Sequence, residues 1–163
     1  MIKLKKLTLR YVNKTYLKWM NDRTVFRYSD QSKYNHNIKD IKDYLKARFN
    51  SNEIIFGIFI KDRHIGNIKL GPIDYLNKAS EISYFIGEKE FWGKGIGTIA
   101  IKKIIKIAKK KGIKKIIAGC VKQNKSSQRV LIKNKFKLEG ELKSQYIIKN
   151  RRTTNFIYGR LIN

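Results

Sequence analysis

The stretch Phe91-Trp92-Gly93-Lys94-Gly95-Ile96-Gly97-Thr98 decides the fold, because the segments on its two sides predict different elements. Residues 81–87 before it alternate and are rich in aromatic and β-branched side chains, which predicts a strand. Apolar residues recur at helical spacing after it, at 101, 104, 105 and 108, with lysines between them. The stretch is therefore expected to be a glycine loop that connects a strand to a helix.

This loop is predicted to bind a phosphate. Glycines at 93, 95 and 97 lack the Cβ atoms that would hold a ligand away from the backbone, and they can adopt positive φ angles. The first turn of the following helix has unpaired N–H donors and the positive end of the helix dipole. A pyrophosphate is the natural ligand for such a helix start.

Two common phosphate-binding motifs do not match this loop. The dinucleotide fingerprint G-x-G-x-x-G needs an acidic residue about 20 positions later. Thr98 stands in place of the third glycine, and residues 91–138 contain no Asp or Glu. The Walker motif G-x-x-x-x-G-K-[ST] is missing from the sequence. A glycine loop that holds coenzyme A is the remaining common case.

Residues 79–142 resemble the GCN5-related N-acetyltransferase (GNAT) family, especially the branch with ribosomal-protein N-terminal acetyltransferases and bacterial amino-sugar acetyltransferases. The pyrophosphate motif of that family, [QR]-x-x-G-x-[GA], corresponds here to Trp92-Gly-Lys-Gly95-Ile-Gly97, with the Trp that this branch often has at the first position. Asn124-Lys-Ser-Ser127-Gln-Arg-Val-Leu131 and Asn134-Lys-Phe136-Lys-Leu-Glu-Gly140 follow in the expected order. Three motifs in register are far more specific than one glycine loop.

The resemblance implies an α/β (α+β) fold in one domain, residues 1–163. The expected sheet is mixed, mostly antiparallel and twisted, with about seven strands, four helices and splayed central strands at 81–87 and 114–121. The implied cofactor is acetyl-CoA (coenzyme A). Its expected contacts are the backbone of Phe85 and Ile86, the loop residues Trp92, Gly93, Lys94, Gly95, Ile96, Gly97 and Thr98, and then Asn124 and Ser127.

The resemblance also implies catalytic roles in direct attack of an amine on the thioester within a ternary complex. Asn124 would bond the pantetheine arm or the attacking group, although it is an equally good helix cap. Ser127 matches the serine that is thought to protonate the thiolate in the ribosomal-protein branch, or it only completes the cap. Other branches use a tyrosine seven residues after the Asn, where this chain has Leu131.

The general base is less well marked. Glu81 is the best carboxylate by position, because it lies on the strand beside the expected acetyl group and could deprotonate an ammonium through water. A glutamate paired with a lysine on the sheet is an equally ordinary explanation. Ribosomal-protein acetyltransferases have a catalytic Glu six residues after the glycine that corresponds to Gly140. This chain has Tyr146 there, which argues against a ribosomal substrate.

Trp19, Asn21 and Tyr146 are the candidate acceptor contacts. The resemblance puts the Trp-x-Asn-Asp region at the border of the acceptor pocket, but Trp19 could equally pack a helix onto the sheet. Tyr146 could be an acid, a substrate contact or a packing residue. The segment between the first two helices, with Tyr28 and Tyr34, is a candidate acceptor lid, whereas the two histidines, His36 and His64, are expected at the surface or in turns.

The rest of the chain predicts strands at 2–10, 53–61, 64–70, 114–121, 137–148 and 153–161, and a loop from Pro72 to 77–78. A short helix is expected to end near 21–22. Asn37 caps a helix that runs to about Asn50, with Asp40 at its third position. A further helix is expected from Asn124 to about Asn134.

The composition sets limits on partners and location. The 163 residues carry a net charge of +26, which would attract coenzyme A, a nucleotide-linked sugar, an acidic peptide or RNA. Lysine-rich composition alone explains the excess equally well. The single cysteine, Cys120, fits a reducing compartment. No apolar run is long enough to span a bilayer, so a cytoplasmic protein is expected. Two histidines and one cysteine predict no metal site.

Three classes of function remain. The favoured one is an acetyl-CoA-dependent N-acetyltransferase acting on a small amine. The specific hypothesis for the acceptor is an amino-sugar nucleotide of bacterial surface-glycan biosynthesis. The second is an acetyltransferase for a protein N-terminus, an antibiotic or a polyamine, the last disfavoured because cations would be repelled. The third is a basic module that binds nucleic acid, which is unlikely because the helix at 102–111 has no aromatic residue. The sequence leaves a homodimer open.

Overall fold

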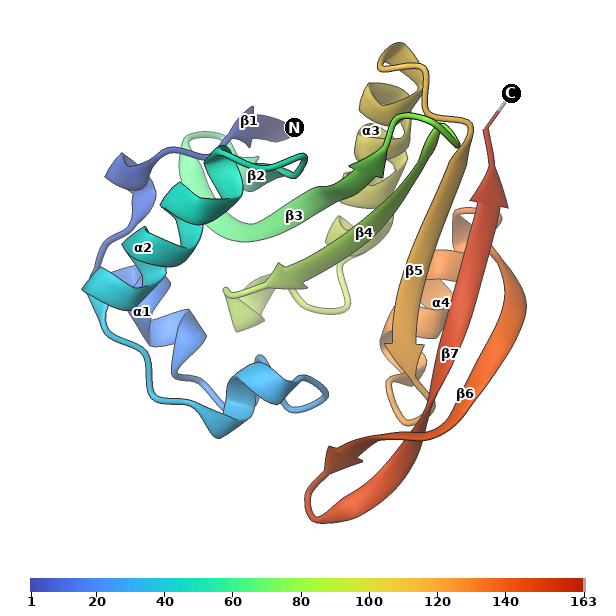
Figure 1. Cartoon of the computed structure of the whole chain (residues 1–163). Coiled ribbons are helices and arrows are strands. Elements are labelled where there is room, and N and C mark those ends of the chain that lie inside the picture. Colours follow the sequence, from blue (N-terminus) through green and yellow to red (C-terminus); the bar gives the residue numbers. More distant parts are fainter. Residues whose placement is uncertain (163) are drawn as a thin grey trace.

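The computed structural model describes residues 1–162 as a seven-stranded sheet with two pairs of helices (Figure 1). The strand order is β1-β2-β3-β4-β5-β7-β6, and every neighbouring pair is antiparallel except β4 and β5. The strands are β1 Ile2–Lys6, β2 Ile54–Ile60, β3 Arg63–Asp74, β4 Ala79–Ile86, β5 Lys115–Val121, β6 Lys137–Ile148 and β7 Arg151–Leu161. The helices are α1 Lys14–Met20, α2 Ile38–Phe49, α3 Ile96–Lys110 and α4 Lys125–Lys133. The predicted fold class is confirmed.

The two central strands separate along their length (Figure 1). β4 and β5 pair in parallel only from Ala79 to Glu81 and from Lys115 to Ile117. Beyond these three pairs, β4 continues with β3 and β5 continues with β7, so each half of the sheet follows its own twist. The expected splay of the central strands is therefore present, and it opens a gap in the middle of the sheet.

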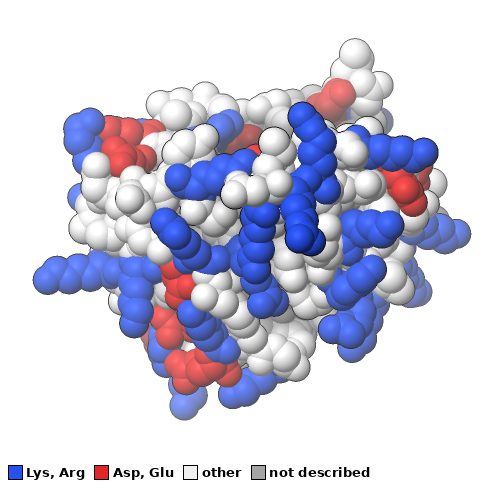
Figure 2. Space-filling model, turned by 90° about the horizontal axis from the view of Figure 1, so that it is seen from below, with Lys and Arg blue, Asp and Glu red and all other residues white. Residues whose placement is uncertain are grey.

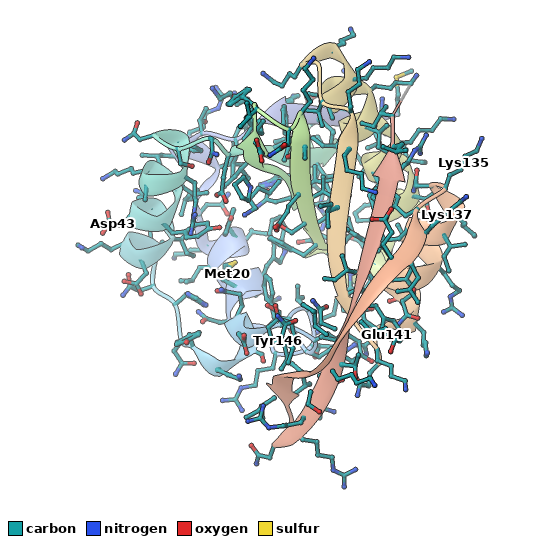
Figure 3. The ribbon with its side chains drawn as sticks, turned by 45° about the vertical axis from the view of Figure 1, so that its right-hand side comes forward. Met20, Asp43, Lys135, Lys137, Glu141 and Tyr146 are labelled. Atoms are coloured by element: carbon teal, nitrogen blue, oxygen red, sulfur yellow. The ribbon has the colours of Figure 1, made fainter. Side chains whose placement is uncertain are left out.

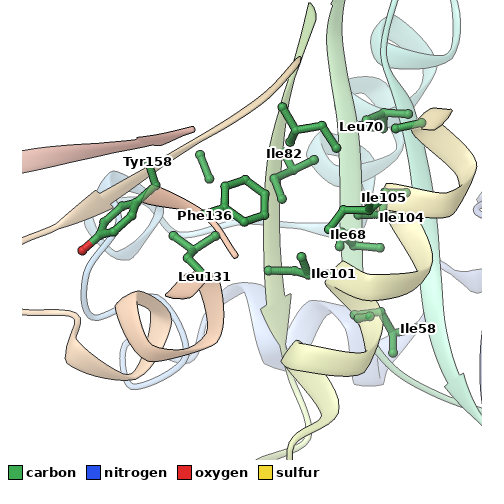
Figure 4. Close-up of a cluster of buried hydrophobic side chains, with 14 of the residues drawn as sticks. Ile58, Ile68, Leu70, Ile82, Ile101, Ile104, Ile105, Leu131, Phe136 and Tyr158 are labelled. Carbon is green, nitrogen blue, oxygen red and sulfur yellow. The ribbon is translucent and has the colours of Figure 1, made fainter. Parts of the chain in front are cut away.

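Two apolar clusters hold the helices to opposite faces of the sheet. The larger one joins α3 and α4 to one face, through Ile101 and Ile104 of α3 and Leu131 of α4 (Figure 4). The smaller one joins α1 and α2 to the other face, through Tyr16, Trp19 and Leu45. Side chains alternate along β2, so that Ile58 belongs to the first cluster and Ile55 to the second.

The local start signals of the helices are confirmed. Asn37 forms a capping box with Asp40 at the start of α2: its Oδ1 accepts from the Asp40 N–H at 2.9 Å, and Asp40 accepts from the Asn37 N–H at 3.1 Å. Asn124 caps α4 by accepting from the Ser127 N–H at 3.2 Å. These caps depend on neighbours within three residues, which is why the sequence reveals them.

Two boundaries differ from the prediction. The strand predicted at 2–10 ends at Lys6, and Leu9–Tyr11 form a 3-10 turn whose Leu9 and Tyr11 pack against the smaller cluster. Pro72 was expected in a loop but lies within β3. Pro72 coincides with the register shift between Leu70 and Ile73, where the ladder of hydrogen bonds is interrupted. A proline, which has no N–H to donate, therefore costs little stability at this position.

No helix in residues 1–162 combines the length and the apolar character that crossing a membrane would require.

Candidate active site

The gap between β4 and β5 leads into a cavity of about 630 Å³. One wall comes from β4, with Tyr84 and Phe85, and the opposite wall from β5, with Cys120. Asn124 and Ser127, at the start of α4, lie at the edge where the two strands part. Further walls come from residues 25–31 and 36–44, from the β6–β7 hairpin, and from α1, β2 and β3 through Tyr16, Met20, Ile55, Asn67 and Lys69.

The glycine loop before α3 fits a pyrophosphate. Gly93 and Gly95 have φ angles of +73° and +75°, and no atom lies within 4 Å of the position that a Cβ would take at either residue. Gly95 is the N-cap of α3 and offers no side chain to the first turn, which contains no acidic residue. The N–H groups of this turn are therefore free to bind an anion. Gly97 packs closely on Tyr84, because a Cβ there would lie 3.0 Å from the Tyr84 ring.

Other loop residues anchor the cradle or border it. The Trp92 indole Nε1 donates to the Ile86 carbonyl at 2.8 Å, so Trp92 ties the loop to β4 and Ile86 already has a partner. The Thr98 carbonyl accepts from Asn134 Nδ2 at 3.2 Å, which ties α3 to the end of α4. Ile96 is buried in the larger cluster, and Lys94 is exposed with its Nζ 5.7 Å from the Phe91 ring.

Ser127 and Tyr84 meet across the mouth of the gap. Ser127 Oγ lies 3.3 Å from the Tyr84 hydroxyl, and either group can donate. Burial raises the pKa of Tyr84 to about 12, so its hydroxyl keeps its proton at neutral pH. The Oδ1 of Asn124 accepts from the Ser127 N–H and from Ser126 Oγ, and within residues 1–162 its Nδ2 makes no hydrogen bond. Cys120 lies beside this pair as a buried thiol, and burial raises its pKa.

Glu81 lies away from this cavity. It is exposed at the last parallel pair of β4 and β5, opposite Ile117, and it lines a separate depression with Pro72 and Ile73. The strands separate only after this residue, so the cavity begins further along β4. The structure therefore does not bring Glu81 together with Asn124 and Ser127.

Of the three predicted acceptor contacts, only Tyr146 lines the cavity (Figure 3). Trp19 is buried, donates from Nε1 to Glu88 Oε1 at 2.9 Å, and packs so closely on Gly87 that a Cβ there would lie 2.2 Å from the indole. Asn21 instead holds the main chain of His36 from both sides, accepting from its N–H at 2.7 Å and donating to its carbonyl at 2.9 Å.

Neither histidine is a simple surface or turn residue. His36 lines the cavity, and its Nε2 is buried with no hydrogen-bond partner within residues 1–162. His64 lies in strand β3, stacked on Phe59 at 5.0 Å, and burial lowers its pKa. Its Nε2 lies 2.8 Å from Asn67 Oδ1, and Asn67 in turn donates to the Tyr16 hydroxyl at 2.8 Å. This chain of contacts connects the strand to the cavity wall.

Aromatic side chains line one part of the cavity, and only two of them, Tyr28 and Phe85, were among the residues predicted from the sequence. Phe26, Tyr28, Tyr44 and Phe85 line it, and the rings of Phe26 and Phe85 are 4.9 Å apart. The segment between α1 and α2, expected as a lid, contains a 3-10 helix at Asp30–Lys33; Tyr28 faces the cavity, but Tyr34 is exposed. The spacing of the aromatic residues between α1 and α2 does not predict which of them face the cavity, because this segment has neither helical nor strand periodicity.

Comparisons with known proteins agree with this geometry. The family model described as acetyltransferase (GNAT) domain matches residues 2–137. The ribosomal-protein-serine acetyltransferase of Escherichia coli (strain K12) is 32% identical over 110 residues, which are 67% of this chain and 61% of that protein. The matched part thus spans less than two thirds of that relative.

Solved structures have the same fold over almost the whole chain. The microcin C7 self immunity acetyltransferase MccE, solved in complex with acetyl-CoA and AMP, has a TM-score of 0.86 and 27% identity, with 99% of this chain and 92% of that chain covered. The ribosomal L7/L12 alpha-N-protein acetyltransferase RimL, in complex with coenzyme A, has a TM-score of 0.90 and 20% identity, with 99% and 94% covered. The chain therefore belongs to the GNAT acetyltransferase family.

Proposed function

We propose that this chain is an acetyl-CoA-dependent N-acetyltransferase and that its acceptor is the N-terminal amine of a peptide or protein. The observation that carries the proposal is the open glycine loop at the uncapped start of α3, which adjoins a cavity between splayed strands. The E. coli relative supports a protein acceptor, because its name describes acetylation of a ribosomal protein. The relatives named above do not support the amino-sugar nucleotide favoured from the sequence, and the peptide acceptor replaces it.

Different residues of the chain bind the pyrophosphate and the pantetheine arm of acetyl-CoA. Acetyl-CoA, when bound, supplies a thioester and a pyrophosphate. The backbone N–H groups of the loop and of the first turn of α3 hold the pyrophosphate, and the unpaired Nδ2 of Asn124 is available to the pantetheine arm. The unpaired edges of β4 and β5 beyond Glu81 and Ile117 can bond the same arm.

The transfer itself needs a neutral amine and a proton for the sulfur. The amine nitrogen bonds to the acetyl carbon, the carbon–sulfur bond breaks, the nitrogen loses one proton, and the thiolate gains one. Ser127, backed by the protonated Tyr84 at 3.3 Å, is the group proposed to donate to the sulfur. The low-dielectric surroundings of Tyr84 strengthen this hydrogen bond.

We expect His36 rather than Glu81 to act as the base, because only His36 of these two lines the cavity. The cavity-lining carboxylates Asp30 and Asp40 are already held by Lys33 and by the Asn37 N–H. The Nε2 of His36 is buried without a hydrogen-bond partner within residues 1–162, so the ring must turn to present it to an acceptor amine. We expect His36→Asn to lose about 100-fold in kcat/KM at pH 6.5 and to recover by pH 9, because a terminal amine with a pKa near 8 then deprotonates by itself. Rates of thiol release against pH measure this; a pH-dependent loss in Glu81→Gln instead would restore the original assignment.

A second candidate acceptor is an amine carried by a nucleotide. It is favoured by the aromatic walls at Phe26, Tyr28, Tyr44 and Phe85, on which a base can stack, and by the complex of MccE with AMP.

The acceptor is tested by mixing the protein with acetyl-CoA and one amine at a time, and by measuring free thiol. Peptides with a free N-terminus are expected to be the best substrates, ahead of aminoacyl-nucleotide analogues, nucleotide amino-sugars and polyamines. A matched peptide with a blocked N-terminus and an internal lysine separates the terminal amine from a side-chain amine. Preference for any other class of amine would overturn the peptide assignment.

A further inference from the structure

The acceptor end of the cavity opens between two segments that are far apart in the sequence. These are residues 22–36, between α1 and α2, and the tip of the β6–β7 hairpin, residues 143–152; they lie near each other at the lower end of the molecule in Figure 1. Phe26 and Tyr28 line the cavity from the first segment, and Tyr146 and Ile148 from the second. Figure 3 shows Tyr146 on the side of the hairpin that is turned toward residues 22–36.

The hairpin tip is strongly basic. It contains Lys143, Lys149, Arg151 and Arg152, and neither Asp nor Glu occurs between 142 and 162. Figure 2, which looks at the lower end of the molecule, shows Lys and Arg side chains spread over this face and acidic side chains in a few clusters. Asp30 and Asp40 line the cavity, and Asp30 is paired with Lys33, so the excess positive charge at this end lies on the hairpin tip.

The register of the hairpin decides which of these charges faces the cavity. Lys149 and Asn150 have positive φ angles of 50° and 59°, the two-residue turn that suits a hairpin, and this turn sets Ile148 opposite Arg151. Directly paired residues project to the same face of a sheet. Arg151 therefore shares the cavity face with Ile148, and Arg152, opposite the exposed Ile147, points to the other face.

Arg151 has a counterpart across the opening. Arg27 lies between the cavity-lining Phe26 and Tyr28, and its guanidinium stacks on the Tyr28 ring at 4.9 Å. Within residues 1–162, no carboxylate lies within 4 Å of Arg27 or Arg151, whereas nearby Asp22 and Asp30 are paired with Lys89 and Lys33. Both arginines thus keep an unneutralised charge at the rim.

We propose that Arg27 and Arg151 form a cationic rim that selects acceptor peptides with acidic residues directly after the acetylated N-terminus. This rests on the proposed function. An extended peptide advances about 3.3 Å per residue. A peptide whose first residue lies at Tyr146 and that runs along β6 therefore comes level with Arg151, which pairs with Ile148 two residues further on, at about its third residue. A nucleic acid fits the rim less well, because Phe26 and Tyr28 line the cavity and only Tyr34 of residues 22–36 offers an aromatic ring on the outer surface.

The test compares three peptides that begin with Ser and continue with three Asp, three Asn or three Lys. Initial rates of thiol release are measured at about 50 mM and 300 mM salt, because screening weakens such contacts. We expect the Asp peptide to exceed the Asn peptide about tenfold in kcat/KM at low salt, and the ratio to fall toward one at high salt. Arg27→Gln and Arg151→Gln should each reduce the ratio to about threefold or less, whereas the outward-facing Arg152→Gln should keep it.

Binding of the N-acetylated Asp peptide, followed by calorimetry, separates this inference from the proposed function. Suppose that no peptide is acetylated, but that the N-acetylated Asp peptide binds to wild type and not to Arg151→Gln. The cationic rim is then supported, and the proposed peptide acetylation is wrong. Equal rates for Asp and Asn peptides, or an equal loss of selectivity in Arg152→Gln, would overturn the rim. If a single-stranded oligonucleotide displaces the peptide and binds more tightly, the ligand of the rim is a nucleic acid and the peptide assignment is overturned.

Discussion

Gly95→Glu is expected to weaken coenzyme A binding about 100-fold while the chain stays folded. Gly95 has a φ angle of +75°, and the space around its missing Cβ is empty. A glutamate there costs about 1–2 kcal/mol of backbone strain and places a carboxylate where the pyrophosphate should bind. Loss of about two charge-assisted hydrogen bonds, roughly 3 kcal/mol together, corresponds to about a 100-fold rise in Kd. Calorimetric titration with coenzyme A measures this rise, and the change in Tm should stay within a few degrees, about 2–4 °C per kcal/mol.

Two matched variants show whether the effect belongs to the site. Gly95→Gln has nearly the size of the glutamate without its charge, so it should weaken binding less. Gly112→Glu places the same residue at the other end of α3, where Gly112 has a φ angle of +76° and open surroundings. It should leave the affinity for coenzyme A unchanged although the backbone strain is similar. Equal affinities in wild type and Gly95→Glu would refute the phosphate cradle.

Features that depend on near neighbours could be predicted from the sequence. The order of strand, glycine loop and helix, the capping box of Asn37 and the cap of Asn124 all involve residues within one turn or one strand. The splay of the central strands came from the family resemblance and not from the residues. It depends on two halves of the sheet that twist independently, which no local pattern reports.

The side chains that face the cavity were harder to predict, because they depend on where the strands part. Glu81 and Tyr84 are three residues apart on β4, yet only Tyr84 lies beyond the last pair with β5 and lines the cavity. Likewise, Trp19 and Asn21 were assigned to the acceptor pocket, but Asn21 acts on His36, a residue 15 positions away. That contact joins the end of α1 to the start of α2 and has no sequence signature.

Counting six residues from Gly140 leads to Tyr146, a position that lines the cavity but does not carry the expected glutamate. The position six residues after Gly140 does line the cavity, although β6 shifts its register between Leu142 and Tyr146. The residue at this position is a tyrosine and not a carboxylate. We therefore expect the base to lie on another wall of the cavity, where His36 is found.

Ser127→Ala is expected to lower kcat about 10- to 100-fold with less than a twofold change in affinity for coenzyme A. Ser127 contributes only its N–H to the helix cap, and alanine keeps that N–H, so α4 should remain intact. What the variant loses is the hydroxyl 3.3 Å from Tyr84, and with it the proposed donor to the departing sulfur. Single-turnover rates and calorimetric titration together separate the chemical step from binding.

Ser126→Ala is the matched control, because Ser126 is the exposed neighbour whose hydroxyl donates to Asn124 Oδ1 at 3.0 Å. Its kcat should stay near that of wild type. Tyr84→Phe should resemble Ser127→Ala if the two hydroxyls act as one unit, and the double variant should then be no slower than either single one. Since the pKa of Tyr84 is raised to about 12, its proton is retained throughout the range where the enzyme can be assayed, and no loss of rate from its ionisation is expected below pH 10. Unaltered turnover in Ser127→Ala, or an equal loss in Ser126→Ala, would remove Ser127 from the mechanism and leave Tyr84 as a packing residue against Gly97.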